Sequence, residues 1–430
     1  MKLVIYGGTV IDPANNREEA LDVLVEEGRI RALAKPGSFL GTGDADIDAS
    51  GLIVAPGFVD MHVHLREPGY EYKETVLSGA QSAVAGGFTT VACMANTNPV
   101  NDNGSVTRYI IEKARAANLA RVFPIGALSK GLKGESLADI GEMAEAGVVA
   151  ISDDGRPVMD GNLMRRALEY CSMFHLPISV HEEDLHLAAG GVMNEGPTSL
   201  RLGLKGIPYA AEDVMVARDL VLARLTGGRL HIAHISTRGA VALVRRAKTE
   251  GLAVTAEAAP HHFTLTEEAV EGYNTNAKMA PPLRQREDVE AVKEGLRDGT
   301  IDAIATDHAP HHHDEKDVEF DQAANGIVGL ETALPLTLRL VNEGRLSLTE
   351  AVRKLTINPA RILGLPYGTL SLGSPADIVI FDPASTWKVV PQRLRSKSKN
   401  TPFGGWELRG KAVITMVGGK IVYDGREVWR

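Results

Sequence analysis

Residues 57–69 read GFVDMHVHLREPG and follow the apolar run LIVA at 52–55. A short apolar run of this kind predicts a strand, here one that ends in a loop. Because successive strand side chains point to opposite faces, His62 and His64 lie on one face, about 7 Å apart along the strand. Two imidazoles so placed can close on one divalent ion. Two surface histidines near a strand end would look the same, so the rest of the chain must decide.

The middle of the chain alternates predicted strands and helices. Seven further strands are predicted, at 89–94, 121–127, 148–153, 177–182, 229–235, 253–260 and 301–308. Helical patterns follow at 104–118, 161–174, 211–226, 238–250, 284–298, 329–344 and 349–363. Eight strands alternating with helices predict an α/β fold with a (β/α)8 TIM-type barrel over 54–367. The rival is a doubly wound open sheet, but no glycine-rich phosphate fingerprint follows any predicted strand.

Both ends of the chain have β patterns. Glycine turns separate paired runs at 3–6 and 9–12, at 22–25 and 29–33, and at 413–417 and 421–423, and a further strand is predicted at 377–381. These patterns are typical of hairpins. Because short hairpins are marginally stable alone, we predict that residues 1–53 and 368–430 build one small composite β-sandwich.

The composition limits the partners and the compartment. The chain has 430 residues, a formal net charge of −9, 44% hydrophobic and 23% charged residues, as in ordinary globular proteins. The acidic balance argues against nucleic acid as a partner. The two cysteines, Cys93 and Cys171, cannot form a disulfide framework and suit a reducing compartment. No apolar run approaches a signal peptide or a membrane span, so we predict a cytoplasmic protein with no membrane partner.

Metal-binding side chains recur where the predicted strands end. Such groups end strands one, four, five, six and eight: His62 and His64, Asp153 and Asp154, His181, His231 and His234, and Asp307 with His308. Each has an ordinary alternative, since an Asp-Asp-Gly segment is also a turn signal and a single histidine is often a core residue. Because the active site of a barrel lies at these strand ends, their coincidence predicts a metal site.

The donor types indicate the chemistry. Histidines and carboxylates without thiolates fit catalytic Zn²⁺, one or two ions per chain, although manganese, cobalt or iron would also fit. A divalent ion lowers the pKa of bound water from about 15.7 to about 7, and a nearby carboxylate can then carry the proton to the leaving group. Asp307 shares a strand face with Ile301, Ala303 and Ala305 and is predicted to point into the barrel mouth as this catalytic group.

Several segments carry a family resemblance. Residues 56–64, 307–311 and 329–332 resemble the amidohydrolase superfamily. Within its cyclic amidohydrolases, the segments 64–69, 94–97, 399–403 and the doublet 153–154 are similar to bacterial long-chain (class I) dihydroorotases. The resemblance spans essentially the whole chain. It implies reversible cyclisation of N-carbamoyl-L-aspartate to L-dihydroorotate in de novo pyrimidine (UMP) biosynthesis, by metal-activated hydroxide.

The resemblance also implies which residues bind metal. The ligands would be His62, His64, Asp154, His181, His234 and Asp307, with Asp307 also the proton shuttle. Related enzymes bridge two metals with a carboxylated lysine on strand four, where this chain has no lysine. An aspartate takes that place, and the family motif favours Asp154 over Asp153.

The substrate implied by the resemblance carries an α-carboxylate, for which a bidentate arginine is the natural partner. The substrate contacts carried over from the family are His64, Arg66, Asn96, His311, Asn325 and Gly326. The segment 310–326 after strand eight is the expected lid.

One departure keeps other substrates open. The family usually has an asparagine directly before Pro281 and Pro282, and this chain has Ala280. An apolar residue there is tolerated in hydantoinases and allantoinases, so a hydantoinase, dihydropyrimidinase or allantoinase is the alternative enzyme. A non-catalytic scaffold for aspartate transcarbamoylase is the alternative from another class, although every ligand position is filled. We expect a homo-oligomer, a dimer, and the resemblance leaves association with aspartate transcarbamoylase open.

Overall fold

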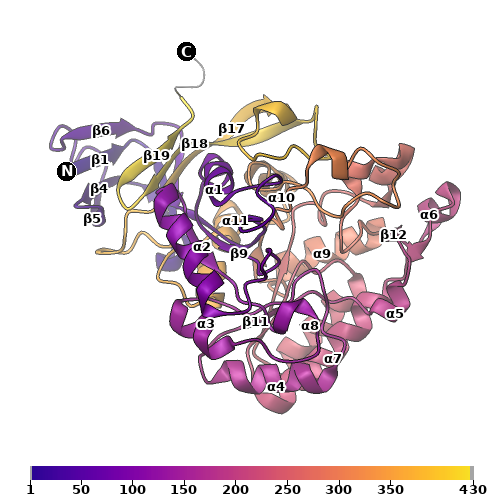
Figure 1. Ribbon diagram of the computed structural model, residues 1–430. Helices are drawn as coiled ribbons and strands as arrows, with labels where there is room; N and C mark the ends of the chain where they lie inside the picture. Colours follow the sequence, from indigo (N-terminus) through magenta and orange to yellow (C-terminus); the bar gives the residue numbers. More distant parts are fainter. Residues whose placement is uncertain (1, 427–430) are drawn as a thin grey trace.

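The computed structural model describes residues 2–426, and it is an α/β structure, as predicted (Figure 1). Its middle part contains two parallel sheets. Strands β8 (Phe58–Val63), β9 (Phe88–Cys93) and β10 (Arg121–Pro124) form one, in the order β10-β9-β8. Strands β11 (Ile178–Val180), β14 (Leu230–Ile232), β15 (Val254–Ala258) and β16 (Ala303–Ile304) form the other, in that order. Single parallel bridges join the edges of these sheets, Gly126 to Ile151 to Ile178 on one side and Val63 to His308 on the other.

The predicted strand at 148–153 does not form a strand, although Ile151 makes the bridges just described. Its neighbours explain this. Pro124 and Pro177 lie opposite this segment and accept hydrogen bonds from the amides of Val149 and Ile151. Proline has no amide hydrogen to return, so the ladder ends after a single residue.

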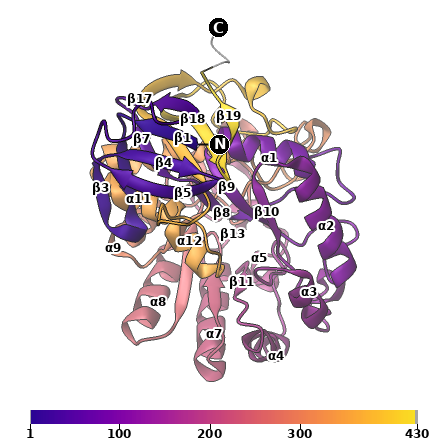
Figure 2. The ribbon, with the colours of Figure 1, turned by 90° about the vertical axis from the view of Figure 1, so that its left-hand side faces the viewer.

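Helices surround the parallel strands, and Figure 2 shows α2, α3, α4, α7 and α8 outside β8 to β11. Polar residues such as Asn103, Asp160 and Thr237 begin them by accepting hydrogen bonds from the first turn. The first nine are α1 (Val76–Ala85), α2 (Gly104–Ala117), α3 (Ile140–Ala146), α4 (Gly161–Ser172), α5 (Leu185–Ala188), α6 (Pro197–Leu202), α7 (Ala210–Thr226), α8 (Arg238–Thr249) and α9 (Arg286–Asp298). The five predicted helices from 104 to 298 are thereby confirmed to within two residues at each end. A two-stranded sheet of β12 (Met193–Asn194) and β13 (Gly206–Ile207) flanks α6.

After β16 the chain forms α10 (Ala333–Asn342), α11 (Leu348–Leu355) and α12 (Ile357–Ile362). The single helix predicted at 349–363 is therefore wrong in one respect, because the backbone of Thr356, with φ −127° and ψ −92°, interrupts it.

Strands from both chain ends share one six-stranded sheet, and Figure 2 shows β7 from the first part of the chain beside β17 from the last part. Its order is β19 (Lys420–Asp424), β18 (Glu407–Val417), β17 (Ile378–Lys388), β7 (Ile53–Pro56), β2 (Thr9–Asp12) and β3 (Arg17–Ala20). The four-stranded sheet has the order β5 (Arg29–Ala34), β4 (Asp22–Glu26), β1 (Lys2–Tyr6) and β6 (Ala45–Asp48). The predicted hairpins β4–β5 and β18–β19 are confirmed.

The predicted hairpin of 3–6 with 9–12 is wrong. β1 pairs with β4 and β6, whereas β2 pairs with β3 and β7, so the chain changes sheets at Gly7 and Gly8. Gly7 has φ +77°, and a Cβ there would lie 2.4 Å from the hydroxyl oxygen of Ser50. The glycines therefore permit a close crossing between two sheets rather than a hairpin turn.

An aromatic cluster lies where the six-stranded sheet meets the parallel strands. The ring of Phe58, which is fully buried, lies 5.6 Å from that of Phe88 and 6.0 Å from that of Phe381, measured between centroids. Gly57 alone separates β7 in one sheet from β8 in the other. The start of the strand that carries His62 is therefore held by packing on both sides.

Candidate metal centre

Histidines from three strand ends meet around one carboxylate. The Nε2 atom of His62 lies 3.3 Å from Oδ1 of Asp154, and Nε2 of His64 lies 3.4 Å from Oδ2. On the other side, Nδ1 of His181 and Nε2 of His234 lie 3.6 and 3.3 Å from Oδ1. These atoms form two groups of three that can each hold a divalent ion, with Asp154 in both.

Asp307 completes the cluster. Its Oδ1 atom lies 3.1 Å from Nε2 of His64 and 3.5 Å from Nε2 of His62. Burial acts to raise the pKa of Asp307, but the charges of His62 and His64 and the hydrogen bond from His64 outweigh it, so the pKa lies below its usual range. Asp307 is therefore ionised at neutral pH.

The neighbouring aspartates of the doublet have different surroundings. Asp153 accepts hydrogen bonds from the backbone amides of Leu128 and Ser129, at 2.7 and 3.0 Å, and from the Ser129 hydroxyl. Burial raises its pKa to about 6. Burial also disfavours the charge on Asp154, but His62 and the other imidazoles outweigh this and hold its pKa well below the usual range. Asp154, and not Asp153, faces the histidines.

Three residues of this site have strained backbone conformations. Arg66, His234 and Asp307 have φ values of +62°, +31° and +47°. Residues other than glycine rarely adopt a positive φ. Such residues cost of order 1–3 kcal/mol each and cluster at functional sites.

The pattern of strand ends did not reveal Glu257, which lies within β15. Its Oε1 accepts a hydrogen bond from Nδ1 of His62 at 2.6 Å, and its Oε2 lies 3.3 Å from Nε2 of His231. Asp60 was missed as well, and its carboxylate accepts from the amides of His62 and Thr306 at 3.0 and 3.1 Å. Both carboxylates are almost fully buried, and only the pairing of distant strands could have identified them.

These residues fit a divalent metal. Because Glu257 occupies Nδ1 of His62, the opposite nitrogen, Nε2, is directed at the carboxylates, and it is buried without a hydrogen bond among residues 2–426. Imidazole nitrogens and carboxylate oxygens are suitable donors, and a carboxylate behind a ligating histidine is the usual supporting arrangement.

A cavity of about 280 Å³ opens onto this cluster. All the residues predicted to contact substrate line it, namely His64, Arg66, Asn96, His311, Asn325 and Gly326, together with Ala280. Glu183 and Leu185 also line the cavity and were not predicted. Gly326 has φ +128°, and a Cβ there would lie 2.6 Å from that of Ala309, so only glycine fits this wall.

Arg66 is held in the cavity by its neighbours. Its Nε donates to the carbonyl of Pro310 at 3.2 Å, and its Nη2 lies 3.2 Å from Nε2 of His311. Burial and the charge of Arg66 lower the pKa of His311 to about 2, so this imidazole is neutral. Its Nδ1 lies 3.3 Å from Glu315, which leaves Nε2 to accept from Arg66.

The sequence profile described as "Amidohydrolase family" matches residues 53–422. The chain belongs to the amidohydrolase family. This confirms the resemblance to the amidohydrolase superfamily. Among curated relatives, "Dihydroorotase" of Geobacter metallireducens is 59% identical over 423 residues, covering 98% of this chain and 100% of the relative. "Dihydroorotase" of Syntrophotalea carbinolica is 58% identical over 424 residues, covering 98% and 99%.

Solved structures of a hydantoinase and a dihydropyrimidinase have a similar fold. The L-hydantoinase (dihydropyrimidinase) from Arthrobacter aurescens has a TM-score of 0.87 at 28% identity, with 98% of this chain and 96% of the other covered. A dihydropyrimidinase from Brevibacillus agri has a TM-score of 0.85 at 22% identity, covering 99% and 96%. In the described residues, no helix is long and apolar enough to cross a membrane.

Proposed function

We propose that this protein is a dihydroorotase, which interconverts N-carbamoyl-L-aspartate and L-dihydroorotate by opening and closing a cyclic amide. The observation that carries the proposal is the position of Arg66, which lines the same cavity as Asp154, His64, His181 and Asp307. A cationic fork beside a metal-capable cluster suits a substrate that has a carboxylate next to its reactive amide. The dihydroorotases at 58–59% identity over nearly the whole chain support it.

The site residues have separate roles in substrate binding, metal binding and proton transfer. Arg66 binds the substrate carboxylate and so orients the ring against the cluster. His62, His64, Asp154, His181, His234 and Asp307 would hold one or two divalent ions, and a bound ion supplies Lewis acidity that polarises the ring carbonyl and lowers the pKa of water. Asp307, ionised and 3.1 Å from His64, accepts at Oδ1 a proton from the water that attacks the ring carbonyl and passes it to the ring nitrogen as the C–N bond breaks.

Zinc is the proposed metal, because histidine and carboxylate donors without thiolate suit it. Elemental analysis of purified protein should find between one and two divalent ions per chain. Removing them with a chelator should abolish turnover, and zinc should restore it. An active metal-free preparation would contradict the assignment.

The alternative enzyme, a hydantoinase or dihydropyrimidinase, is favoured by one observation, the apolar Ala280 in the cavity wall. Turnover of dihydroorotate, hydantoin and allantoin by one metal-assayed sample separates the possibilities. We expect dihydroorotate to be preferred, whereas faster turnover of hydantoin would favour the alternative. A sample that contains metal but turns over none of them would favour the scaffold.

The finer structural predictions remain proposals. We propose that the bridges at Ile151 and His308 close the two parallel sheets into a (β/α)8 barrel, and that the two outer sheets form one composite domain. The assigned ranges stay 54–367 for the barrel and 1–53 with 368–430 for the composite domain. A cytoplasmic location, a homodimer and association with aspartate transcarbamoylase also stay predictions.

A further inference from the structure

A buried lysine lies in the loop that follows the last barrel strand. The side chain of Lys316 is 6% exposed, and its ammonium donates to three backbone carbonyls. These are the carbonyls of Ala324 at 2.6 Å, Gly326 at 3.1 Å and Lys278 at 3.3 Å. An ammonium has three hydrogens, so the charged group meets all three acceptors at once.

The three carbonyls belong to two separate segments that contribute residues to the substrate cavity. Gly326 and its neighbour Asn325 line one wall, and Lys278 lies two residues before Ala280 in the other. The amide of Gly326 also donates to the carbonyl of Lys278 at 3.0 Å. Lys316 therefore ties the segment after β16 to the segment around Ala280, in addition to the direct hydrogen bond between Gly326 and Lys278.

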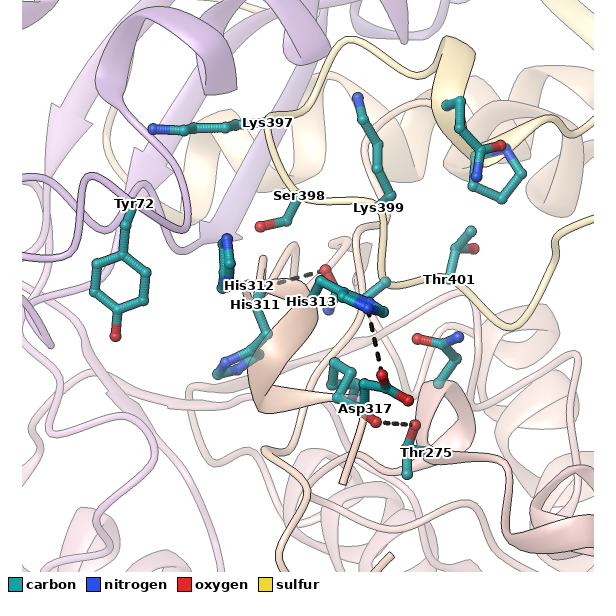
Figure 3. Close-up of a pocket in the computed structure, with 15 residues that line it drawn as sticks. Tyr72, Thr275, His311, His312, His313, Asp317, Lys397, Ser398, Lys399 and Thr401 are labelled. Carbon is teal, nitrogen blue, oxygen red and sulfur yellow. Dashed lines mark hydrogen bonds and ion pairs between the residues drawn. The ribbon is translucent and has the colours of Figure 1, made fainter. Parts of the chain in front are cut away.

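The outer side of this loop borders open space. A second cavity of about 500 Å³ lies there, lined by 311–313 and 316–317 on one side and by 397–401 on the other. Figure 3 shows His312, His313 and Asp317 across from Lys397, Ser398 and Lys399. His311 lines both cavities. The loop is held on this outer side at its ends, where Asn400 accepts from the amide of His311 and donates to the carbonyl of Gly326, each at 3.0 Å, and at Glu315, which pairs with Lys73 at 2.7 Å. On its inner side, the ammonium of Lys316 holds it.

We propose that Lys316 is a positioning residue for substrate binding, whose charged ammonium holds Asn325 and Gly326 at the distance from Ala280 that the substrate ring requires. The proposal rests on the proposed function, because it assigns the ring of dihydroorotate to the space between these walls. Lys316 itself does not line that space, so it acts through the backbone that it holds.

The charge of Lys316 depends on pH near neutrality. Burial and the nearby ammonium of Lys278 lower its pKa to about 7, while Glu315 opposes this change. His311 is the other titratable group that faces it, and its own low pKa keeps it neutral. The amine that forms above pH 7 has only two hydrogens and turns a lone pair towards carbonyls, so one contact must fail.

Deprotonation of Lys316 has opposite effects on the stability of the fold and on substrate binding. Folding lowers the pKa of Lys316 from 10.5 to about 7, so the unfolded chain binds more protons between these values. This group therefore makes the fold more stable as pH rises through that window. Substrate binding changes in the opposite direction, because the ammonium contacts are lost over the same rise.

The test compares wild type with Lys316→Met, using the metal-loaded enzyme and initial rates of dihydroorotate hydrolysis from pH 6 to pH 8.5. At pH 6 the variant should have a KM about tenfold higher and a kcat within about threefold, since charge-assisted hydrogen bonds to the wall are lost. The KM ratio of variant to wild type should fall towards one at pH 8.5. Lys354→Met is the matched control: Lys354 is also 6% exposed, and its ammonium donates to the carbonyl of Ile301 at 2.6 Å, away from the cavity.

A KM ratio near one at pH 6, a ratio that does not change with pH, or an equal rise in Lys354→Met would overturn the proposal. If Lys316→Met does not fold, hydrogen exchange of wild type still decides it. After correction for intrinsic exchange, protection of the Gly326 amide should fall between pH 6 and pH 8.5, and unchanged protection would refute the proposal. Wild type without dihydroorotate turnover would disprove the proposed function, whereas the exchange measurement would still report on Lys316.

Discussion

Replacing Glu257 by glutamine tests whether a residue hidden within a strand supports the metal centre. Glu257 is 1% exposed and contacts two imidazoles, Nδ1 of His62 at 2.6 Å and Nε2 of His231 at 3.3 Å. Glutamine keeps the shape but has no charge, and its NH2 group cannot accept a hydrogen bond. Even where the amide oxygen replaces Oε1, the hydrogen bond from Nδ1 of His62 is no longer charge-assisted, and His231 loses a nearby negative charge.

The size of the effect follows from the bond that is weakened. A hydrogen bond to a charged group contributes about 1.5–3 kcal/mol, which corresponds to about 10- to 100-fold in an equilibrium constant. Because Nδ1 of His62 is the atom held by Glu257, this loss falls on the orientation and basicity of a predicted ligand. Substitution of such supporting groups lowers metal affinity by about 10- to 100-fold.

The measurement is zinc affinity by competition with a chelator of known affinity, followed by kcat at saturating zinc. Glu267→Gln is the control, because Glu267 is 4% exposed and accepts from Asn194 and Thr198, outside the cluster. We expect weaker zinc binding in Glu257→Gln only, with activity partly restored by excess zinc. Affinity within about twofold of wild type, or an equal loss in the control, would refute the supporting role of Glu257.

Three further substitutions test other parts of the site and fold. Asp307→Asn should lower kcat by about 10²- to 10⁴-fold without unfolding the protein. The control Asp317→Asn, at an exposed aspartate, should leave kcat unchanged. Substantial residual turnover in Asp307→Asn would exclude Asp307 as the proton shuttle. Arg66→Ala should lower kcat/KM for dihydroorotate at least about 30-fold and leave hydantoin turnover nearly unchanged, and equal losses for both would argue against a carboxylate contact. Phe58→Ala should lower the free energy of unfolding by about 3–5 kcal/mol in urea titrations, against less than about 0.5 kcal/mol for the exposed Leu40→Ala. Similar values for these two would show that the aromatic cluster contributes little.

Strand ends were predictable because the carboxyl ends of neighbouring parallel strands meet at one edge whatever their separation along the chain. His62 and His234 are far apart in sequence, yet both lie beside Asp154. The alternation of side chains then placed them inward. Only local information was needed for these residues, since each marks the end of its own strand.

Pairing between distant segments was not predictable in the same way. The glycines at 7 and 8 have the local pattern of a hairpin turn. The approach of Ser50 and Val54 to these glycines depends on distant residues, which a local pattern does not reveal. The segment around Ile151 has the composition of a strand, but its ladder is limited by prolines in its neighbours. The role of Glu257 was not predictable for the same reason, because its partner His62 is 195 residues away.

The doublet Asp153-Asp154 shows why neighbouring residues of one type can have separate tasks. Asp154 lies in the turn that follows Ile151, and there Asp153 is directed to the amides of Leu128 and Ser129 while Asp154 is directed to the histidines. Asp153 binds the amides of Leu128 and Ser129 and so fixes the loop after β10 to the segment after Ile151. Asp154 is thereby held at the centre of the cluster, where its two oxygens reach both groups of histidines. The predicted ligand and its support are therefore encoded side by side, and exchanging their roles would require the whole segment to shift by one residue.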